Sequence, residues 1–470
     1  MQTGSLRAVL ILRPLSGAGH LFQGTRMQRK TAASVLVSIA LVAAMLPVAS
    51  AATTIEPAGY GAHRWLRNPI IVSLSSSLDS LPSNVKAGSD VRAAVRRALQ
   101  SWSDDTGIQF FETTSSNEKI SPANDGDGVN LITISPVNAA EFAQSDAPAR
   151  TRLFFDSGGA IIEADIALNP AAQFSDDGTI GTYDLESTFA HEVGHLIGLP
   201  HSGVIGATMQ PRQAQNGVYG LPAFTQRTLS ADDLASVRAL YGDSSGYSSI
   251  SGRLTTNTSG RARSIFGAQM FAEDVATGNV VGSSVSSTSG SYRVDGLSAG
   301  VYRVFAQPLD GAVEPEEIAA NGPAQTTPLF RSFIASNTSP TQSLNVGANA
   351  SLKLSFFVFP RTPTLTPRFI GMNGELSTAP LPLRAGDEVT IYVAGEGIDE
   401  IAADGISISS PLISVMPGSL HEAKFDTPFP AISFDIAIGR NIQFGDYTIR
   451  LQTTKGELAF LPGAITIGSK

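Results

Sequence analysis

The sequence contains no cysteine among its 470 residues. Disulfide bonds and thiolate metal ligands are therefore excluded, and any metal ion must be bound by histidines or carboxylates. Charged residues make up only 16% of the chain, and Asp and Glu (41) outnumber Lys and Arg (32). An acidic chain without a basic cluster is a poor nucleic-acid binder, so we expect no nucleic-acid partner.

Long apolar runs are also scarce, and the most pronounced lies near the N-terminus. It extends from Val35 to Val48, after the basic stretch Met27 to Lys30 and before the small residues Ala49 to Ala51. This order predicts a secretory signal peptide that is cleaved near Ala51. The run is shorter than the roughly 20 residues that span a bilayer. We therefore expect no stable membrane span and a secreted protein. A start at Met27 would give a signal peptide of normal length, so we expect translation to begin there, and whether residues 1–26 are translated stays open.

Histidine is rare too, with six in the chain, but three of them stand in one HExxHxxGxxH pattern. Residues four apart lie on one face of a helix, so His191 and His195 can bind the same metal ion. Glu192 points about 100° round the helix axis, clear of the metal but near a water bound to it. Gly198 can end the helix in a left-handed conformation, and the returning chain then delivers His201. Three neutral imidazoles with one open position are typical of a catalytic zinc, with Glu192 as the base.

Hydrophobic periodicity around this motif predicts an α+β domain. The expected strands are Ile70 to Val72, Ile108 to Glu112, Leu131 to Ile134, Arg152 to Phe155 and Ile161 to Leu168. Three helices are expected. The first runs from a cap at Ser89 or Asp90 to Trp102, the second begins between Thr182 and Asp184 and continues through the zinc motif, and the third runs from Ser230 to Gly242.

Residues 60 to 242 resemble a matrixin-type catalytic domain of the metzincin metalloproteases. The resemblance rests on the complete zinc motif, Ser202 after the third histidine, Met209 as the Met-turn methionine, and the closing Leu-Ser-x-Asp-Asp…Leu-Tyr-Gly helix from Leu229. It implies a zinc endopeptidase with a mixed sheet, and a peptide substrate extended alongside an edge strand. It also implies that Met209 packs beneath the metal without binding it. The loop from Met209 to Ser230 would line the pocket for the side chain that follows the scissile bond.

The chain departs from vertebrate matrixins in its second metal site and in its latency, and the pattern is more similar to that of compact bacterial relatives. No histidine lies between residues 64 and 190, so the second, structural zinc of those enzymes is not expected. Without cysteine, latency through a propeptide thiolate is excluded. The loop Asn124 to Gly128 offers carboxylates for calcium but lacks the full EF-hand spacing, and a solvated turn is the preferred interpretation. We expect one catalytic zinc and no other cofactor, with calcium as the less favoured addition.

From Ser249 the residue pattern changes to short apolar stretches separated by glycines, and this pattern predicts β-sandwiches. Residues 247–360 resemble a carboxypeptidase regulatory-like, transthyretin-like sandwich, in which Tyr292 and Tyr302 are expected to be core or corner residues. Residues 361–470 resemble an immunoglobulin-like surface domain, with a fibronectin-like sandwich as the alternative. The isolated histidine in this last part, His421, is expected to be solvated.

The sequence thus predicts a multi-domain chain. Its expected parts are a signal peptide region (1–51), an α+β metzincin catalytic domain (52–246) and two all-β sandwich domains (247–360 and 361–470). The predicted function is that of a secreted zinc metalloendopeptidase that acts on proteins or peptides. The alternative is a surface adhesin whose sandwiches bind a matrix or cell-surface ligand, with proteolysis secondary. The intact zinc motif favours the peptidase.

Overall fold

The structure is a computed structural model. It describes residues 63–143, 145, 147–242, 246–258, 260–318, 325–335 and 343–468, together with the backbone of β1 (Ala49–Ser50). The rest of the predicted signal peptide and residues 243–245, near the end of the predicted catalytic domain, lie outside the described residues. In the described part of the chain, no helix is both long and apolar enough to span a membrane.

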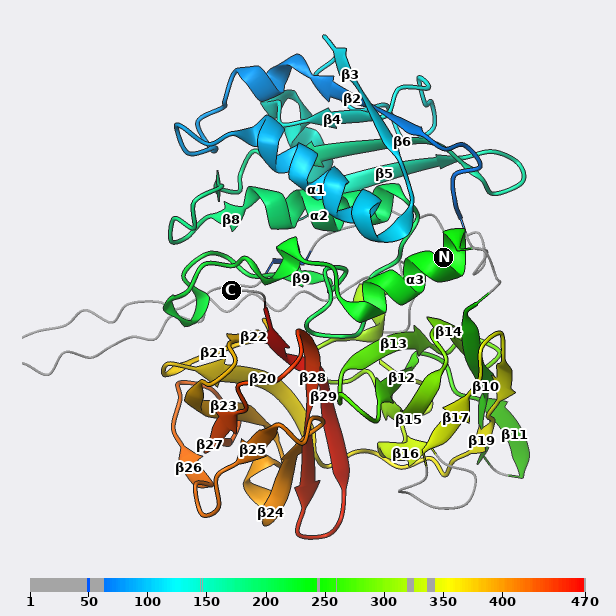
Figure 1. Ribbon diagram of the computed structural model, residues 1–470, viewed down its shortest axis with the longest axis vertical. Coiled ribbons are helices and arrows are strands. Elements are labelled where there is room, and N and C mark those ends of the chain that lie inside the picture. The colour runs from blue at the N-terminus through cyan, green and yellow to red at the C-terminus, as the bar shows by residue number, and fades with distance from the viewer. Residues whose placement is uncertain are drawn as a thin grey trace, which may run out of the picture. The chain divides into compact units, whose positions relative to one another are not determined.

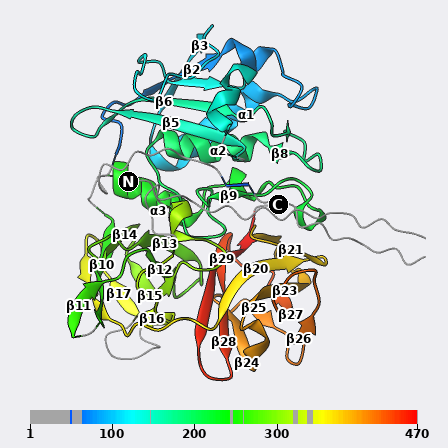
Figure 2. The same cartoon turned by 180° about the vertical axis from the view of Figure 1, so that it is seen from behind.

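The first part of the described chain is built on a five-stranded mixed sheet with the order β3-β2-β4-β6-β5. Neighbouring strands are parallel except for β5, which pairs antiparallel with β6 and forms one edge. In both views β5 lies between β6 and helix α2 (Figures 1 and 2). The strands are β2 (Ile70–Ser75), β3 (Phe110–Ser115), β4 (Leu131–Thr133), β5 (Ala149–Phe155) and β6 (Ile161–Leu168).

Helix α1 (Val91–Thr106) buries the apolar face that its sequence predicts. The side chain of Asp90 caps it by accepting from the amide of Ala93, and Gly107 ends it in a left-handed conformation. The buried positions follow the helical repeat, so one stripe packs inward while the other faces carry charge. They are Val91, Ala94, Val95, Ala98, Leu99 and Trp102.

Helix α2 (Leu185–Leu196) carries the first half of the zinc motif and is buried on nearly every side. Asp184 caps it, as expected, by accepting from the amide of Ser187. The indole of Trp102 in α1 donates to the carbonyl of Ala190, and the indole of Trp65 donates to that of Leu196. Two buried tryptophans therefore fix the position of the helix along its axis.

The chain turns back directly after α2. Gly198 has a φ of +97°, and a Cβ there would lie 2.2 Å from the carbonyl oxygen of His63. The predicted left-handed glycine is confirmed, and the close approach of His63 gives a second reason for its lack of a side chain. Helix α3 (Ala231–Tyr241) then closes this part of the chain, with the predicted capping box between Ser230 and Asp233.

The described chain after residue 246 is almost entirely β-structure (Figure 1). The strands from β10 to β19 form two five-stranded sheets that share one apolar core. These strands are β10 (Ser248–Thr258), β11 (Arg261–Ser264), β12 (Ala268–Asp274), β13 (Val280–Val285), β14 (Ser291–Leu297), β15 (Gly300–Pro308), β16 (Phe333–Ala335), β17 (Leu344–Val346), β18 (Ser351–Lys353) and β19 (Phe356–Phe357).

A six-stranded and a four-stranded sheet follow, with a second apolar core. Their strands are β20 (Thr366–Met372), β21 (Glu375–Ser377), β22 (Leu381–Leu383), β23 (Glu388–Glu396), β24 (Ile401–Ile408), β25 (Ile413–Val415), β26 (His421–Ala423), β27 (Ala431–Ile438), β28 (Gly445–Thr453) and β29 (Leu458–Ile467).

The tyrosine and histidine predictions for this β-region are confirmed. Tyr292 and Tyr302 are buried, and their hydroxyls donate to the carbonyls of Leu354 and Ser298 respectively. His421 is exposed.

Tyr219 links the loop after the zinc motif to the C-terminal sheets. It is buried, has a positive φ of 60°, and its hydroxyl donates to the carbonyl of Ala379 over 2.9 Å. Its amide donates to the carboxylate of Glu375, and its carbonyl accepts from the side chain of Asn373. Side chain and backbone of this one residue are both held by the β-region.

Candidate metal centre

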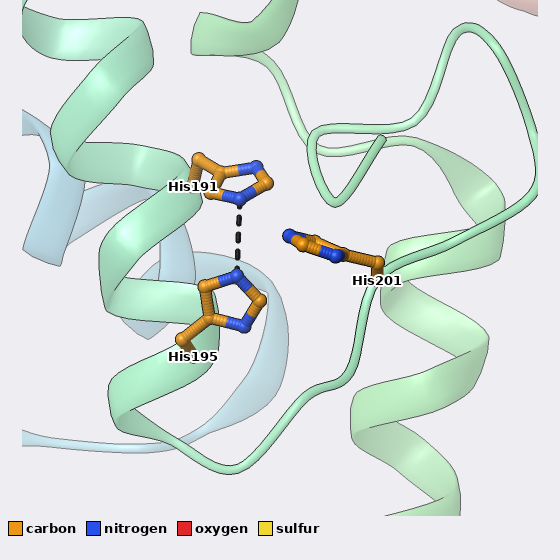
Figure 3. Close-up of side chains that lie close together, drawn as sticks. All are labelled: His191, His195 and His201. Atoms are coloured by element: carbon orange, nitrogen blue, oxygen red, sulfur yellow. Dashed lines mark hydrogen bonds between the residues drawn. The ribbon is translucent and has the colours of Figure 1, made fainter. Parts of the chain in front are cut away.

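Three imidazoles meet beside the C-terminal half of helix α2. His191 and His195 project from adjacent turns of the helix, and His201 reaches them from the returning chain (Figure 3). The Nε2 atoms of His191 and His195 are 3.0 Å apart, and the ligand atoms of all three residues lie within 4.8 Å of one another. Ligand nitrogens of a tetrahedral zinc site are separated by about 3.3 Å, so the cluster has the size that such an ion requires.

Each imidazole contacts a backbone carbonyl through its Nδ1 atom. His191 contacts the carbonyl of Thr208, and His195 contacts that of Leu199, both over 2.8 Å. His201 contacts the carbonyl of Glu317 over 2.5 Å. Because a carbonyl only accepts, Nδ1 must carry the proton in each ring. That tautomer leaves the Nε2 lone pair for a metal, which is the usual arrangement around a ligating histidine.

The electrostatics keep these rings neutral. Burial, with repulsion from His201, lowers the pKa of His191 to about 3, and burial lowers the pKa of His201 to about 4. The pKa of His195 also falls well below its ordinary value, because the ring is buried beside the other two. Neutral imidazoles are the form that binds a metal, so the donor set fits a zinc ion.

Glu192 is buried beside the cluster on the edge-strand side of α2. Its carboxylate accepts a hydrogen bond of 2.5 Å from the hydroxyl of Thr151 in β5. Burial raises the pKa of Glu192 to about 7, while the Thr151 hydroxyl and the charge of Arg150 lower it. A carboxylate with a pKa near neutrality is suited to exchange protons with a nearby water, and a bound dication would shift its pKa downward.

Met209 lies against the helix between the two histidine positions. A Cβ on Gly194 would lie 2.2 Å from the sulfur of Met209 and 2.9 Å from the ring of Trp102. Met209 is itself only 2% exposed. The methionine thus packs under the histidine-bearing turn of α2, at a position where only glycine leaves it room.

Asp233 supports the same turn, and the sequence alone did not predict that role. Besides its part in the cap of α3, its carboxylate accepts from the amides of Thr208 and Met209 over 2.8 and 3.1 Å. Since Thr208 provides the carbonyl that His191 contacts, Asp233 fixes the support of one imidazole. The capping pattern gave its position, but no sequence signal indicated its second pair of contacts.

The loop Asn124 to Gly128 gives no support for calcium. Among the described residues, the imidazole cluster is the only group of three or more His, Cys, Asp or Glu side chains close enough to share an ion. Asp127 accepts from the amide of Val129, and Glu163 accepts from the amide of Gly128. The first bond is that of an Asx turn, and the second ties the loop to β6, 35 positions along the chain.

Comparison with known proteins follows the same division of the chain. Residues 65–242 match the family model described as Matrixin. The hatching enzyme of Paracentrotus lividus is 32% identical over 203 residues, which cover 41% of this chain and 28% of that protein. The metalloendoproteinase 4-MMP of Arabidopsis thaliana is 30% identical over 188 residues, which cover 39% of this chain and 49% of that protein. The matrixin resemblance predicted from the zinc motif is confirmed.

The chain thus spans less than half the length of these two relatives. Among solved structures, the major pilin subunit BcpA of Bacillus cereus is 14% identical to this chain, and the match covers 46% of this chain and 66% of the pilin chain. Its TM-score of 0.15 is too low to carry an argument about fold. The resemblances predicted for residues 247–360 and 361–470 therefore stay predictions.

Proposed function

We propose, because residues 65–242 match the matrixin family model, that this protein is a secreted zinc-dependent endopeptidase that hydrolyses peptide bonds in extracellular proteins. The observation that carries the proposal is the convergence of three neutral imidazoles beside a buried carboxylate of raised pKa. A cluster of histidines alone would suit a structural ion. The adjacent proton acceptor favours catalysis.

The proposed metal ligands are His191, His195 and His201. When bound, zinc supplies a Lewis acid that lowers the pKa of its water to about 7 and polarises the scissile carbonyl. The three carbonyls that accept from Nδ1 hold the rings in place for this ion. The proposed role of Met209 is to pack beneath α2 and keep His191 and His195 at their spacing.

Glu192 is the proposed general base and acid. It accepts the proton of the attacking water and later donates it to the leaving amine. Thr151 positions one oxygen of this carboxylate, and the other is proposed to carry the proton. The proposed proton carrier is thus a buried side chain, that of Glu192.

The proposed substrate path follows the free edge of β5. This strand has a sheet partner only on its β6 side among the described residues. An extended peptide can pair with such an edge through backbone hydrogen bonds and be held across the metal centre. The loop from Met209 to Ser230 would then form the wall of the pocket beyond the scissile bond.

Secretion is proposed from the basic, apolar and small-residue order of residues 27–51. Most of these residues lie outside the described part of the chain, so the proposal depends on the sequence alone. N-terminal sequencing of the protein recovered from culture medium would test it, with Ala52 as the expected first residue.

Replacing Thr151 with valine is expected to lower kcat about tenfold with unchanged zinc content. Valine keeps the shape of threonine but cannot donate to Glu192, and a hydrogen bond to a charged group contributes about 1.5–3 kcal/mol. Steady-state cleavage of a fluorogenic peptide measures the effect. Thr151→Ser, which retains the hydroxyl, serves as the control, and a valine variant as fast as the serine variant would contradict the role of Thr151.

The proposed function is tested by metal analysis of residues 52–470 combined with cleavage of a peptide library. One zinc per chain is expected, with internal peptide bonds cleaved, activity lost on chelation and regained on addition of zinc. A protein that binds one zinc but cleaves no peptide would overturn the proposed activity and leave a metal-binding module.

A further inference from the structure

The residues that follow β15, 309–318, leave that strand's sheet and contact the metal centre. This segment contains the short helix α4 (Pro315–Ile318). Residues 65–242, which match the matrixin model, are called the matrixin part here. Val313 and Ile318 are buried in an apolar cluster that also contains Ile205 and Val218 of the matrixin part. The segment is thus packed against the loops that follow the zinc motif.

One of the three imidazoles depends on this segment for its orienting carbonyl. The carbonyls that contact His191 and His195 come from residues 17 and 4 positions away. The carbonyl that contacts His201 belongs to Glu317, 116 positions away and within the β-region. The matrixin part alone therefore lacks one of the three contacts that set the imidazole tautomers.

The side chain of Glu317 holds this carbonyl in place. One carboxylate oxygen contacts Nε of Arg212 over 2.5 Å, and the other accepts from the amide of Glu314 over 2.9 Å. The side chains of Arg212 and Glu317 are only 20% and 12% exposed, so solvent screens the pair less than it screens a surface pair. Arg212 belongs to β9 (Arg212–Gln213), three residues after Met209. The ion pair thus connects α4 to the turn beneath the metal centre.

We propose that α4 is part of the metal centre, with Glu317 as a positioning residue whose carbonyl orients His201 and whose ion pair with Arg212 fixes that carbonyl. The inference rests on the zinc site of the proposed function. Its consequence is that the β-region determines part of the zinc affinity of the matrixin part. Outer-shell partners of ligating histidines typically change metal affinity by about 10- to 100-fold.

The test measures zinc affinity, by competition with a chelator of known affinity, on the chain from residue 52 to 470. Glu317→Ala and Arg212→Met are each expected to weaken zinc binding about tenfold. The double variant is expected to be no weaker than either single variant, because both remove the same contact. Glu316→Ala is the matched control: Glu316 is the exposed neighbour of Glu317 in α4, and its variant should bind zinc like the wild type.

The outcomes separate this inference from the proposed function. A wild-type chain that binds no zinc would defeat the proposed function itself. A wild type that binds zinc, with unchanged affinity in Glu317→Ala and Arg212→Met or with fully additive losses in the double variant, would overturn only the role of α4. Should Glu317→Ala fail to fold, Arg212→Met alone removes the ion pair and leaves the backbone of α4 unchanged, and wild-type zinc affinity in that variant would overturn the inference.

Discussion

Replacing Glu192 with glutamine is expected to lower kcat/KM by about 10³-fold while the protein still binds one zinc. A positioned general base contributes roughly 10²–10⁴-fold to a rate, and glutamine cannot accept the proton. The amide has nearly the shape of the carboxyl group and keeps an oxygen that accepts from Thr151, so the packing of this buried residue is preserved. Peptide cleavage kinetics and zinc analysis of the same preparation measure the effect.

Glu186→Gln is the control for this experiment. Glu186 lies in the same helix but forms ion pairs with Arg97 and Arg227, away from the imidazoles. Its variant is expected to cleave at nearly the wild-type rate. A Glu192→Gln protein that was fully loaded with zinc and as active as this control would eliminate Glu192 as the base.

Asp446→Asn is expected to stabilise the protein at pH 8 by about 2–4 kcal/mol and to have little effect at pH 4. Asp446 lies in β28, is 3% exposed, and accepts from the hydroxyl of Thr466. A Cβ on Gly206 would come within 2.2 Å of its carboxylate, so the group is packed against the loop after the zinc motif. Burial, with repulsion from Asp233 and Asp232, raises its pKa from 3.8 to about 7.

The sign of this effect follows from proton binding. Between pH 4 and 7 the folded protein holds a proton on Asp446 that the unfolded chain releases. The contribution to the free energy of unfolding is therefore complete below about pH 3.8 and is lost as the pH rises through about 7. Asparagine accepts the same Thr466 bond without titrating.

Thermal unfolding at pH 4 and pH 8 measures the difference. Asp404→Asn, which changes an exposed aspartate of β24, should keep the pH dependence of the wild type. If Asp446→Asn lost stability between these pH values as steeply as Asp404→Asn does, Asp446 would not be the source of the effect.

Elements governed by local spacing were predictable from the sequence. The buried face of α1 follows from its repeat, and the caps Asp90 and Ser230 follow from short side chains before an apolar stripe. Strand ends were less predictable. The strand expected from Ile108 to Glu112 runs from Phe110 to Ser115, because its pairing with β2 decides where it begins and ends.

The supports of the candidate site were not predictable in the same way. Thr151 contacts Glu192 across 41 positions, and Glu317 contacts His201 across 116. Neither residue stands in a pattern of its own, since each is placed by the register of a strand or by the docking of a segment. A spacing motif names the residues that share one turn or loop, but carries no information on which distant carbonyl or hydroxyl completes their contacts.

The anchoring of Tyr219 bears on how selective the proposed enzyme would be. A free loop beyond Met209 would lose conformational entropy each time a peptide entered the pocket, and that loss would oppose binding. Here the side chain and backbone of Tyr219 are fixed by Ala379, Glu375 and Asn373, so much of that ordering accompanies folding. A pocket wall ordered in advance cannot reshape itself around different side chains. We therefore expect a narrow cleavage preference, and expect it to widen when the contacts of Tyr219 with the β-region are removed.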